Sequence, residues 1–352
     1  MQKTDITKLV RKNILSLKPY SSARDEFSGS DGVFLDANEN PFGELNRYPD
    51  PHQKELKQRL SELKSVPVSN IFVGNGSDEV IDLTFRIFCN PGRDNALIFT
   101  PTYGMYEVSA EINEVELVKV PLTHSFQIDF DALEKYLDDK SLKLIFICSP
   151  NNPTANSLEN IEQVLQKFNG IVVVDEAYID FSKASSFLTK IDQYPNLIVM
   201  QTFSKAWGLA AARVGMAYSN DLIISLYNKV KPPYNVSAPN QKAALKALED
   251  KSGFEKRKSI ILEQRKWLQN QLEGLSVVIK IYPSDANFLL VEMTDANKIY
   301  NKLVNQKVIT RNRHSVVQNC IRITVGNPEE NQALIEALKR VGRPESEARN
   351  KV

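Results

Sequence analysis

The chain has 352 residues, of which 42% are hydrophobic and 25% are charged, the proportions of an ordinary folded globular protein. Its length exceeds what one hydrophobic core usually holds, so we expect one large domain and one smaller domain. The formal net charge of +1 argues against binding to nucleic acid or to a membrane surface through bulk electrostatics.

The cysteine, histidine and apolar patterns exclude several further classes of protein. The cysteines and histidines are few and scattered: Cys89, Cys148, Cys320, His52, His124 and His314. Such spacing implies neither a disulfide framework nor a metal site. The opening segment MQKTDITKLVRKN has no apolar signal core, and no run approaches the ~20 apolar residues of a membrane span. We therefore expect a cytoplasmic metabolic protein without a metal.

Seven short apolar runs lie between about residues 71 and 219, and amphipathic stretches separate several of them. The runs are IFVGNGSDE, NALIFTPTY, VELVKVPL, LKLIFICSPNNPT, GIVVVDEAYIDF, NLIVMQTFSK and RVGMAYS. Continuous β-rich runs separated by helices are typical of a mostly parallel sheet covered on both faces. The pattern predicts a large α/β domain over residues 31–240, built on a doubly wound seven-stranded sheet.

The pattern changes after about Lys229. A proline-rich hinge, KPPYNVSAP, precedes a helix and a long charged stretch. Shorter elements follow: LSVVIKIYPS, ANFLLVEM, a helix near ANKIYNKLVNQ, and the strands KVITRNR and CIRITVG. These elements predict a smaller α+β C-terminal domain over residues 241–352.

Polar residues follow several of the predicted strands, where ligands bind in open parallel sheets. The turn GNGSDE leads into a helix that starts at Ser77 and Asp78, whose backbone N–H groups form a ready anion site. Glu79 occupies the third glycine position of a dinucleotide fingerprint, which argues against a dehydrogenase. Most glycine turns before helices are simply turns, so this segment needs support from others.

Two later strands also end in polar residues. Asp175 ends the almost entirely apolar run GIVVVD, where an acid either caps the next element or pairs with a cationic ligand. The segment SPNNPT ends another strand, and a plain turn would explain it equally well.

Lys205 and Arg213 are the only charged side chains between Gln193 and Asn220. Desolvation lowers the pKa of a lysine, and the neutral amine can attack a carbonyl. Alone, such a lysine more often reaches water from a mostly buried segment. Together, however, a helix start, a buried acid, a lysine and an arginine form the set that pyridoxal phosphate requires.

The segments SPNNPT, VDEAY and TFSKAWGLAAARVG resemble those of fold-type I pyridoxal-phosphate aminotransferases, and the resemblance covers essentially the whole chain. FLDANENPFG, YPDP and CIRITVG sharpen it to the histidinol-phosphate aminotransferases. The resemblance implies that Lys205 forms a Schiff base with pyridoxal 5′-phosphate, that Asp175 partners the pyridine nitrogen, and that Tyr178 belongs to the catalytic set. It assigns further cofactor contacts to Gly76, Ser77, Asp78, Tyr103, Asn152, Thr202, Ser204 and Arg213.

The same resemblance implies a reaction. L-Histidinol phosphate and 2-oxoglutarate would give imidazole-acetol phosphate and L-glutamate in histidine biosynthesis. The planar fork of arginine suits both a phosphate and a carboxylate. The residues assigned to the substrate are Tyr20, Asn38, Tyr48, Arg311 and Arg322.

The two arginines differ in how well the sequence supports them. Arg311 alone is equally well explained as an exposed strand arginine. Arg322 stands between Ile321 and Ile323, which strand alternation places on the opposite face. Arg313 shares the face of Arg311 and is easily confused with it.

The resemblance also implies a homodimer with shared active sites. Residues 1–30 would form an N-terminal arm that packs with the small domain and the partner subunit, and Tyr48 would reach the partner's site. As lone residues, Tyr20 and Tyr48 would more often be packing tyrosines.

One position departs from the family pattern, because the usual N-P-T-G reads N-P-T-A and ends in Ala155. Alanine does not readily adopt a positive φ, so we expect an αR or β backbone there.

Three alternatives remain open from the sequence. An aromatic or broad-specificity aminotransferase and a phospho-amino-acid decarboxylase share the chemistry, and the fold does not separate them. The paired arginines argue only weakly against the aromatic enzyme. A non-catalytic regulatory module that binds the cofactor is more remote, because such modules usually carry a DNA-binding domain and few residues precede Asp36.

Overall fold

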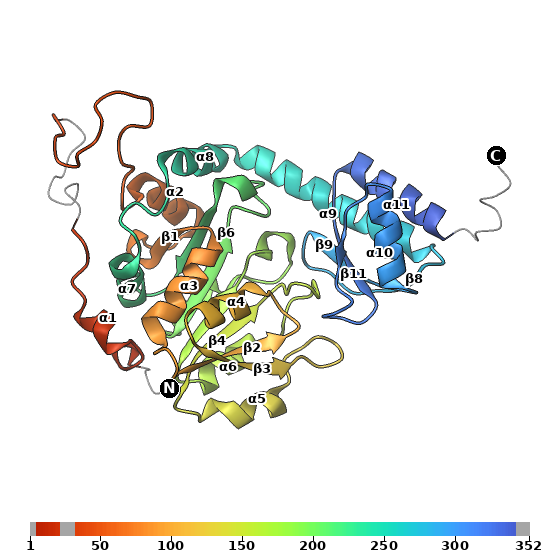
Figure 1. Ribbon diagram of the computed structural model, residues 1–352, viewed down its shortest axis with the longest axis horizontal. Helices are drawn as coiled ribbons and strands as arrows, with labels where there is room; N and C mark the ends of the chain where they lie inside the picture. Colours follow the sequence, from red (N-terminus) through yellow and green to blue (C-terminus); the bar gives the residue numbers. More distant parts are fainter. Residues whose placement is uncertain (1–4, 22–31, 343–352) are drawn as a thin grey trace.

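A seven-stranded sheet forms the centre of the larger part of the molecule in the computed structural model, which describes residues 5–21 and 32–342 (Figure 1). Its strands are β1 (Ile71–Asn75), β2 (Asn95–Thr100), β3 (Glu116–Pro121), β4 (Leu142–Cys148), β5 (Ile171–Asp175), β6 (Leu197–Thr202) and β7 (Val214–Tyr218). Their order is β1-β7-β6-β5-β4-β2-β3. Neighbours from β6 to β3 run parallel, whereas β7 is antiparallel to both β1 and β6. The predicted mostly parallel α/β sheet is confirmed.

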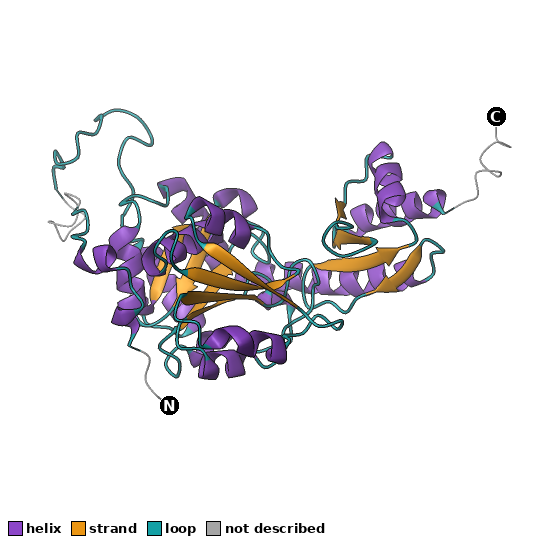
Figure 2. Cartoon of the chain, turned by 60° about the horizontal axis from the view of Figure 1, so that its bottom comes forward, coloured by secondary structure: helices purple, strands orange, loops and turns teal. Residues whose placement is uncertain are grey.

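Helices cover both faces of this sheet (Figure 2). Successive side chains of β4 alternate between two hydrophobic cores, with Leu144 and Phe146 in one and Ile145 and Ile147 in the other. The first core is closed by α1 (Lys12–Ser16), α3 (Ser77–Phe88), α4 (Met105–Ile112) and α7 (Asp221–Val230). The second is closed by α2 (Lys54–Lys64), α5 (Phe130–Leu137), α6 (Ile161–Lys167) and α8 (Ala238–Glu249).

Short 3₁₀ helices connect several of these elements: η1 (Ile6–Lys8), η3 (Val68–Asn70), η4 (Ile179–Phe181), η5 (Phe187–Lys190) and η6 (Ala210–Ala212). Within the described part of the chain, no helix combines the length and apolarity needed to cross a membrane. The predicted arm over residues 1–30 is described only at residues 5–21, and its remaining residues lie outside the described ranges.

A four-stranded antiparallel sheet lies in the smaller part of the molecule, with the order β10-β11-β9-β8. Its elements are α9 (Lys251–Glu273), β8 (Val278–Ile281), β9 (Phe288–Met293), α10 (Ala296–Asn305), β10 (Arg311–Asn312), β11 (Cys320–Thr324) and α11 (Pro328–Val341). Ile321 and Ile323 are buried in the core between this sheet and its helices. Strand alternation therefore turns Arg322 towards the other face of the sheet.

The predicted strand KVITRNR is much shorter in the structure, where β10 holds only Arg311 and Asn312. The preceding residues are drawn back to the end of α10, because the N–H of Val308 donates to the carbonyl of Leu303 at 3.0 Å. Lys307 also has a φ of +59°, which turns the chain away from the ladder.

The long helix α9 spans the two parts of the molecule (Figure 1). Near its N-terminus Phe254 belongs to the core of the large sheet, whereas Leu268 and Leu272 belong to the core of the small sheet. The preceding helix α8 also contributes Ala244 and Leu248 to the large core. The domain boundary near residue 240 stays a prediction, since the change of core falls within α9.

The backbone at Ala155 contradicts the expectation of an αR or β conformation, because its φ is +70°. Hydrogen bonds on both sides hold it there. Its N–H donates to the carbonyl of Asn151 at 2.7 Å, and its carbonyl accepts from the N–H of Asp285 at 2.8 Å. A left-handed alanine costs on the order of 1–2 kcal/mol, which these contacts and the buried methyl group offset.

We expect Ala155→Gly to change the free energy of unfolding by less than about 0.5 kcal/mol. Relief of the left-handed backbone offsets the lost methyl burial and the greater freedom of the unfolded chain. Ala244→Gly removes an equally buried methyl group from helix α8, and we expect it to destabilise by about 1–2 kcal/mol. Urea denaturation compares the two variants. Equal destabilisation by both would contradict backbone strain at Ala155.

Candidate active site

A cavity of about 320 Å³ lies at the carboxyl ends of β4, β5 and β6, and residues of β10 and β11 line it as well. It brings together residues that are far apart in the sequence. They are Ser77, Asp78, Tyr103, Cys148, Asn152, Asp175, Ala177, Tyr178, Thr202, Ser204, Lys205, Arg213, Arg311, Arg313 and Arg322. The cavity therefore joins most of the predicted cofactor residues to both predicted substrate arginines.

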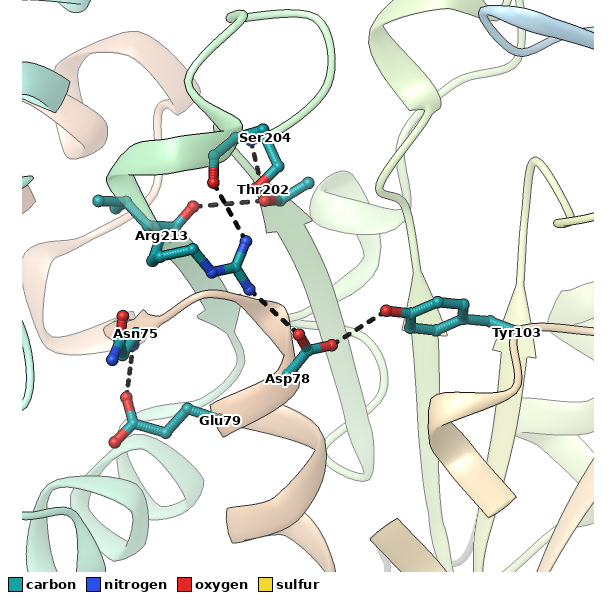
Figure 3. A network of polar contacts seen from close by, with 9 residues as sticks. Asn75, Asp78, Glu79, Tyr103, Thr202, Ser204 and Arg213 are labelled. Atoms are coloured by element: carbon teal, nitrogen blue, oxygen red, sulfur yellow. Dashed lines mark hydrogen bonds and ion pairs between the residues drawn. The ribbon is translucent and has the colours of Figure 1, made fainter. Parts of the chain in front are cut away.

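At one end of the cavity, Asp78 in the first turn of α3 lies beside the guanidinium of Arg213 (Figure 3). Gly76 precedes the helix with a φ of +79°, and a Cβ atom there would lie 2.6 Å from Nη2 of Arg213. Glycine is thus required both by the backbone and by the close approach of the guanidinium. A cation beside free helical N–H groups is a favourable setting for a phosphate.

Asp78 and the carbonyl of Ala210 hold this guanidinium in place, and Tyr103 in turn holds Asp78. Nη2 of Arg213 donates to Oδ2 of Asp78 at 3.1 Å, and its Nη1 donates to the carbonyl of Ala210 at 3.2 Å. The hydroxyl of Tyr103 donates to Oδ1 of the same carboxylate at 3.1 Å (Figure 3). Burial, followed by the charge of Asp78, raises the pKa of Tyr103, so this hydroxyl keeps its proton.

The turn that carries Lys205 follows β6 and is tied to β7. The hydroxyl of Thr202 accepts from the N–H of Ser204 at 3.0 Å and donates to the carbonyl of Val214 at 3.3 Å. Nζ of Lys205 lies 5.4 Å from the ring centroid of Tyr178. Solvent reaches this lysine, yet the surrounding protein lowers its pKa, first by desolvation and then by the charge of Arg322.

Asp175 is buried at the end of β5 and accepts two hydrogen bonds. The N–H of Ala177 donates to Oδ1 at 3.0 Å, and the hydroxyl of Tyr106 donates to Oδ2 at 2.7 Å. Desolvation outweighs both donors, and the pKa of the carboxyl is raised. Within the described residues, no lysine or arginine forms an ion pair with it.

Tyr106 was missed by the sequence analysis. It is fully buried in α4, stacks on Phe146 with ring centroids 5.0 Å apart, and meets the ring of Tyr103 edge-on at 5.6 Å. The only signal in the sequence is its place three residues after Tyr103, near the start of α4. Its partner Asp175 lies 69 residues away.

Arg322 joins the small sheet to the loop after β4. Its Nη1 donates to Oδ1 of Asn152 at 2.6 Å, and its guanidinium carbon lies 5.3 Å from the ring centroid of Phe288. The contact fixes the orientation of the amide, so Nδ2 of Asn152 is the atom that can donate to a ligand. Tyr178 packs edge-on against Phe288 at 5.2 Å, and burial raises the pKa of its phenol.

Three predicted substrate residues lie elsewhere in this chain. Tyr20 lines a separate cavity with His52 and Lys229. Asn38 and Tyr48 line another, where Tyr48 stacks on Tyr234 with ring centroids 4.3 Å apart. Arg313, by contrast, lines the cavity that holds Lys205 and Asp175, although the sequence analysis treated it only as a neighbour of Arg311.

The cavity fits pyridoxal phosphate in three respects. It offers a helix N-terminus beside a guanidinium at a glycine that admits no side chain, a buried carboxylate with no cation partner among the described residues, and an accessible lysine of lowered pKa. In the described part of the chain, no group of three His, Cys, Asp or Glu side chains is arranged to hold a metal ion.

Comparison with known proteins finds relatives over almost the whole chain. Residues 28–338 match the profile of the family described as aminotransferase class I and II. A histidinol-phosphate aminotransferase from Cytophaga hutchinsonii is 52% identical over 340 residues, which cover 94% of this chain and 97% of the relative.

Two solved structures show the same fold. A histidinol-phosphate aminotransferase from Clostridium acetobutylicum has a TM-score of 0.78 at 24% identity, covering 85% of this chain and 91% of its own. A histidinol-phosphate aminotransferase from Sinorhizobium meliloti, in complex with pyridoxal-5′-phosphate, has a TM-score of 0.76 at 25% identity, covering 84% of this chain and 82% of its own.

We expect Asp175→Asn to stabilise the protein when it is prepared without ligand. Because burial raises the pKa of Asp175 above its ordinary 3.8, ionisation above that pH favours the unfolded state. The amide removes this cost and can still bond to Tyr106 and Ala177. The free energy of unfolding should rise by about 1–2 kcal/mol at pH 7, and the difference should disappear below pH 3.8.

Glu176→Gln is the matched control, because Glu176 is equally buried and its pKa is also raised by burial. Its carboxylate, however, accepts from three donors, on Ser186, Phe187 and Gln201. An amide would turn an N–H towards one of them, so we expect a loss of about 1–3 kcal/mol. Denaturant titrations from pH 3 to 8 measure the free energy of unfolding of both variants. Stabilisation by Glu176→Gln would contradict the inference that its three donors, unlike the two at Asp175, require a carboxylate.

Proposed function

The chain belongs to the aminotransferase class I and II family, and from this we propose that it interconverts L-histidinol phosphate and 2-oxoglutarate with imidazole-acetol phosphate and L-glutamate. Relatives that are about 50% identical are histidinol-phosphate aminotransferases, which supports a role in histidine biosynthesis. The observation that carries the proposal is one cavity holding Lys205, the buried Asp175, the Arg213 anion site and two arginines of the small sheet. We propose that the enzyme acts in the cytoplasm, where small metabolites are its substrates.

Pyridoxal 5′-phosphate supplies the electron sink for the carbon that loses its proton. We infer that Arg213 and the N-terminus of α3 hold its phosphate. Asp175 would hold the pyridine nitrogen, and Nδ2 of Asn152 and the hydroxyl of Tyr178 would donate to the phenolic oxygen. The remaining predicted contacts are Gly76, Ser77, Asp78, Tyr103, Thr202 and Ser204, of which Tyr103 would stack on the ring.

Lys205 is the proton carrier in this proposal. Its lowered pKa raises the fraction of neutral amine near pH 7, and a neutral Nζ can take a proton from the substrate carbon that bears the amino group. Two neighbours tune it in opposite directions, because Arg322 lowers the pKa and Asp175 raises it. Tyr178 lies beside it and limits where the amine can move.

Arg322 and Arg311 would bind the anionic end of either substrate. A guanidinium pairs with a carboxylate or a phosphate through parallel N–H bonds. Arg322 is held by Asn152 and Phe288 before any substrate binds, so little side-chain freedom is lost on binding. Arg311 is its direct partner across β10 and β11, so both reach the same region.

We expect Lys205→Ala to lower turnover of L-histidinol phosphate with 2-oxoglutarate by at least about 1,000-fold, because among the described residues no other amine lines the cavity to carry the proton. Noncovalent cofactor binding can persist through Arg213 and Asp175. Lys183→Ala, on the exposed surface, is the control and should retain parental turnover. Steady-state assays measure the turnover of both variants. Near-parental turnover of Lys205→Ala would contradict the assignment of Lys205 as the proton carrier.

We also infer a homodimer in which the segment before α2 meets the second subunit. Several large apolar side chains of this segment are 74–89% exposed in the single chain: Val33, Leu35, Phe42 and Leu45. Tyr48 is 51% exposed and lies outside the cavity of its own chain. Several large apolar side chains exposed within one short segment support an interaction surface. A second copy would cover it, and Tyr48 would reach the partner's cavity.

Subunit mixing tests this shared site. We expect Tyr48→Ala and Lys205→Ala each to be nearly inactive, and a mixture of the two to recover activity after subunit exchange. Each hybrid dimer then has one site with both residues intact, so about a quarter of parental activity should return. If Tyr48 acts within its own chain, mixing restores nothing. Analytical ultracentrifugation of the parent tests whether dimers are present.

A further inference from the structure

Three arginines lie on one face of the small sheet. Arg311 and Arg322 are direct partners across β10 and β11. Arg313 follows two residues after Arg311, and its N–H donates to the carbonyl of Cys320 at 2.9 Å, which continues the ladder. The strand period of two therefore places Arg313 on the face of Arg311 and Arg322. All three residues line the cavity that also holds Lys205 and Asp175.

These positive charges are not neutralised by the protein. Within residues 5–21 and 32–342, none of the three forms an ion pair with a carboxylate. Arg322 donates to the neutral amide of Asn152, and Nε of Arg313 is buried without a hydrogen-bond partner. Burial lowers the pKa of Arg313, and the charges of Arg322 and Arg311 lower it further. This end of the cavity thus carries a concentration of positive charge that an anion would relieve.

The two proposed substrates differ in the charge that they present to this end. A carboxylate brings one negative charge and two oxygens, which one or two arginine forks satisfy. A phosphate monoester brings a charge of about −1.5 to −2 at pH 7 and three oxygens. A third guanidinium therefore has a partner in the phosphate substrate that it lacks in a carboxylate.

We propose, on the basis of the proposed function, that Arg313 is a specificity-determining residue that binds the second negative charge of the phosphate ester. Arg313 and Arg322 are partly buried, whereas Arg311 is exposed. Of the two partly buried arginines, Arg322 already donates to Asn152, whereas Nε of Arg313 has no hydrogen-bond partner among the described residues. A partly desolvated charge discriminates more strongly between a dianion and a monoanion than one in water does. Arg311 and Arg322 would then bind either anion, and Arg313 would favour the phosphate.

Two small probes isolate this charge. Ethyl phosphate is mainly a dianion at pH 7.5, ethyl sulfate is a monoanion of the same tetrahedral shape, and neither carries a second anionic group. Their inhibition constants against L-glutamate are measured with the cofactor-loaded enzyme, whose cofactor phosphate site is already filled. The variants are Arg313→Gln, Arg313→Lys and, as an exposed control in the last turn of α11, Arg340→Gln.

We expect Arg313→Gln to raise the inhibition constant of ethyl phosphate about 10- to 30-fold and that of ethyl sulfate less than about 3-fold. The substitution removes a charge-assisted contact that only the dianion makes. Arg313→Lys keeps the positive charge but loses the planar guanidinium, so its inhibition constant for ethyl phosphate should lie between those of the parent and of Arg313→Gln. Arg340→Gln should change neither constant. Equal weakening of both probes by Arg313→Gln, or no weakening of either, would overturn the proposal.

The proposal and the proposed function fail in different ways. If the parent converts L-histidinol phosphate but Arg313→Gln keeps its preference for ethyl phosphate, Arg313 is not the discriminating residue and the function stands. If the parent prefers ethyl phosphate through Arg313 but does not convert L-histidinol phosphate, the substrate is wrong and the role of Arg313 stands. Thermal melts of each variant identify misfolding, and Arg313→Lys keeps the test informative if the Gln variant is unstable.

Discussion

The buried carboxylate of Asp175 is the constraint on which the rest of the site depends. Removing an acid from water is costly, and the two donors that Tyr106 and Ala177 provide offset only part of that cost, as the raised pKa shows. In the proposed complex, a cationic ring nitrogen at this point would offset the remainder. The surrounding elements hold the carboxylate in place: β4 and β6 flank the strand that ends in Asp175, and α4 supplies Tyr106.

The loop after β4 connects the large-sheet part of the molecule to the small-sheet part. Asn152 meets Arg322 from the small sheet, and three residues later the carbonyl of Ala155 accepts from the N–H of Asp285. The side chain of Asp285 in turn accepts from the N–H of Ser157 at 3.0 Å. A substrate anion that moves Arg322 therefore acts directly on the amide that we assign to the cofactor. The left-handed backbone at Ala155 is the local cost of holding this loop between two sheets.

The sequence predicted features that local chemistry determines, and it failed where distant contacts decide. Apolar runs predicted all seven strands of the large sheet, and the combined motifs with the family resemblance selected Lys205 and Arg213, which both line the cavity. Ala155 was predicted wrongly because its conformation is held by Asp285, 130 residues further on. Tyr106 was missed because its partner lies 69 residues away. The placement of Tyr48 in a neighbouring subunit stays a prediction, because a single chain contains only one side of that contact.

The most direct test of the function is a single-turnover absorbance measurement on the cofactor-loaded enzyme. L-Histidinol phosphate, phenylalanine and O-phosphothreonine are offered separately, and the spectrum of the bound cofactor is followed. We predict rapid conversion of the cofactor to its aminated form by L-histidinol phosphate and much slower conversion by the other two. Equally rapid conversion by phenylalanine, or release of carbon dioxide from O-phosphothreonine, would contradict a histidinol-phosphate aminotransferase.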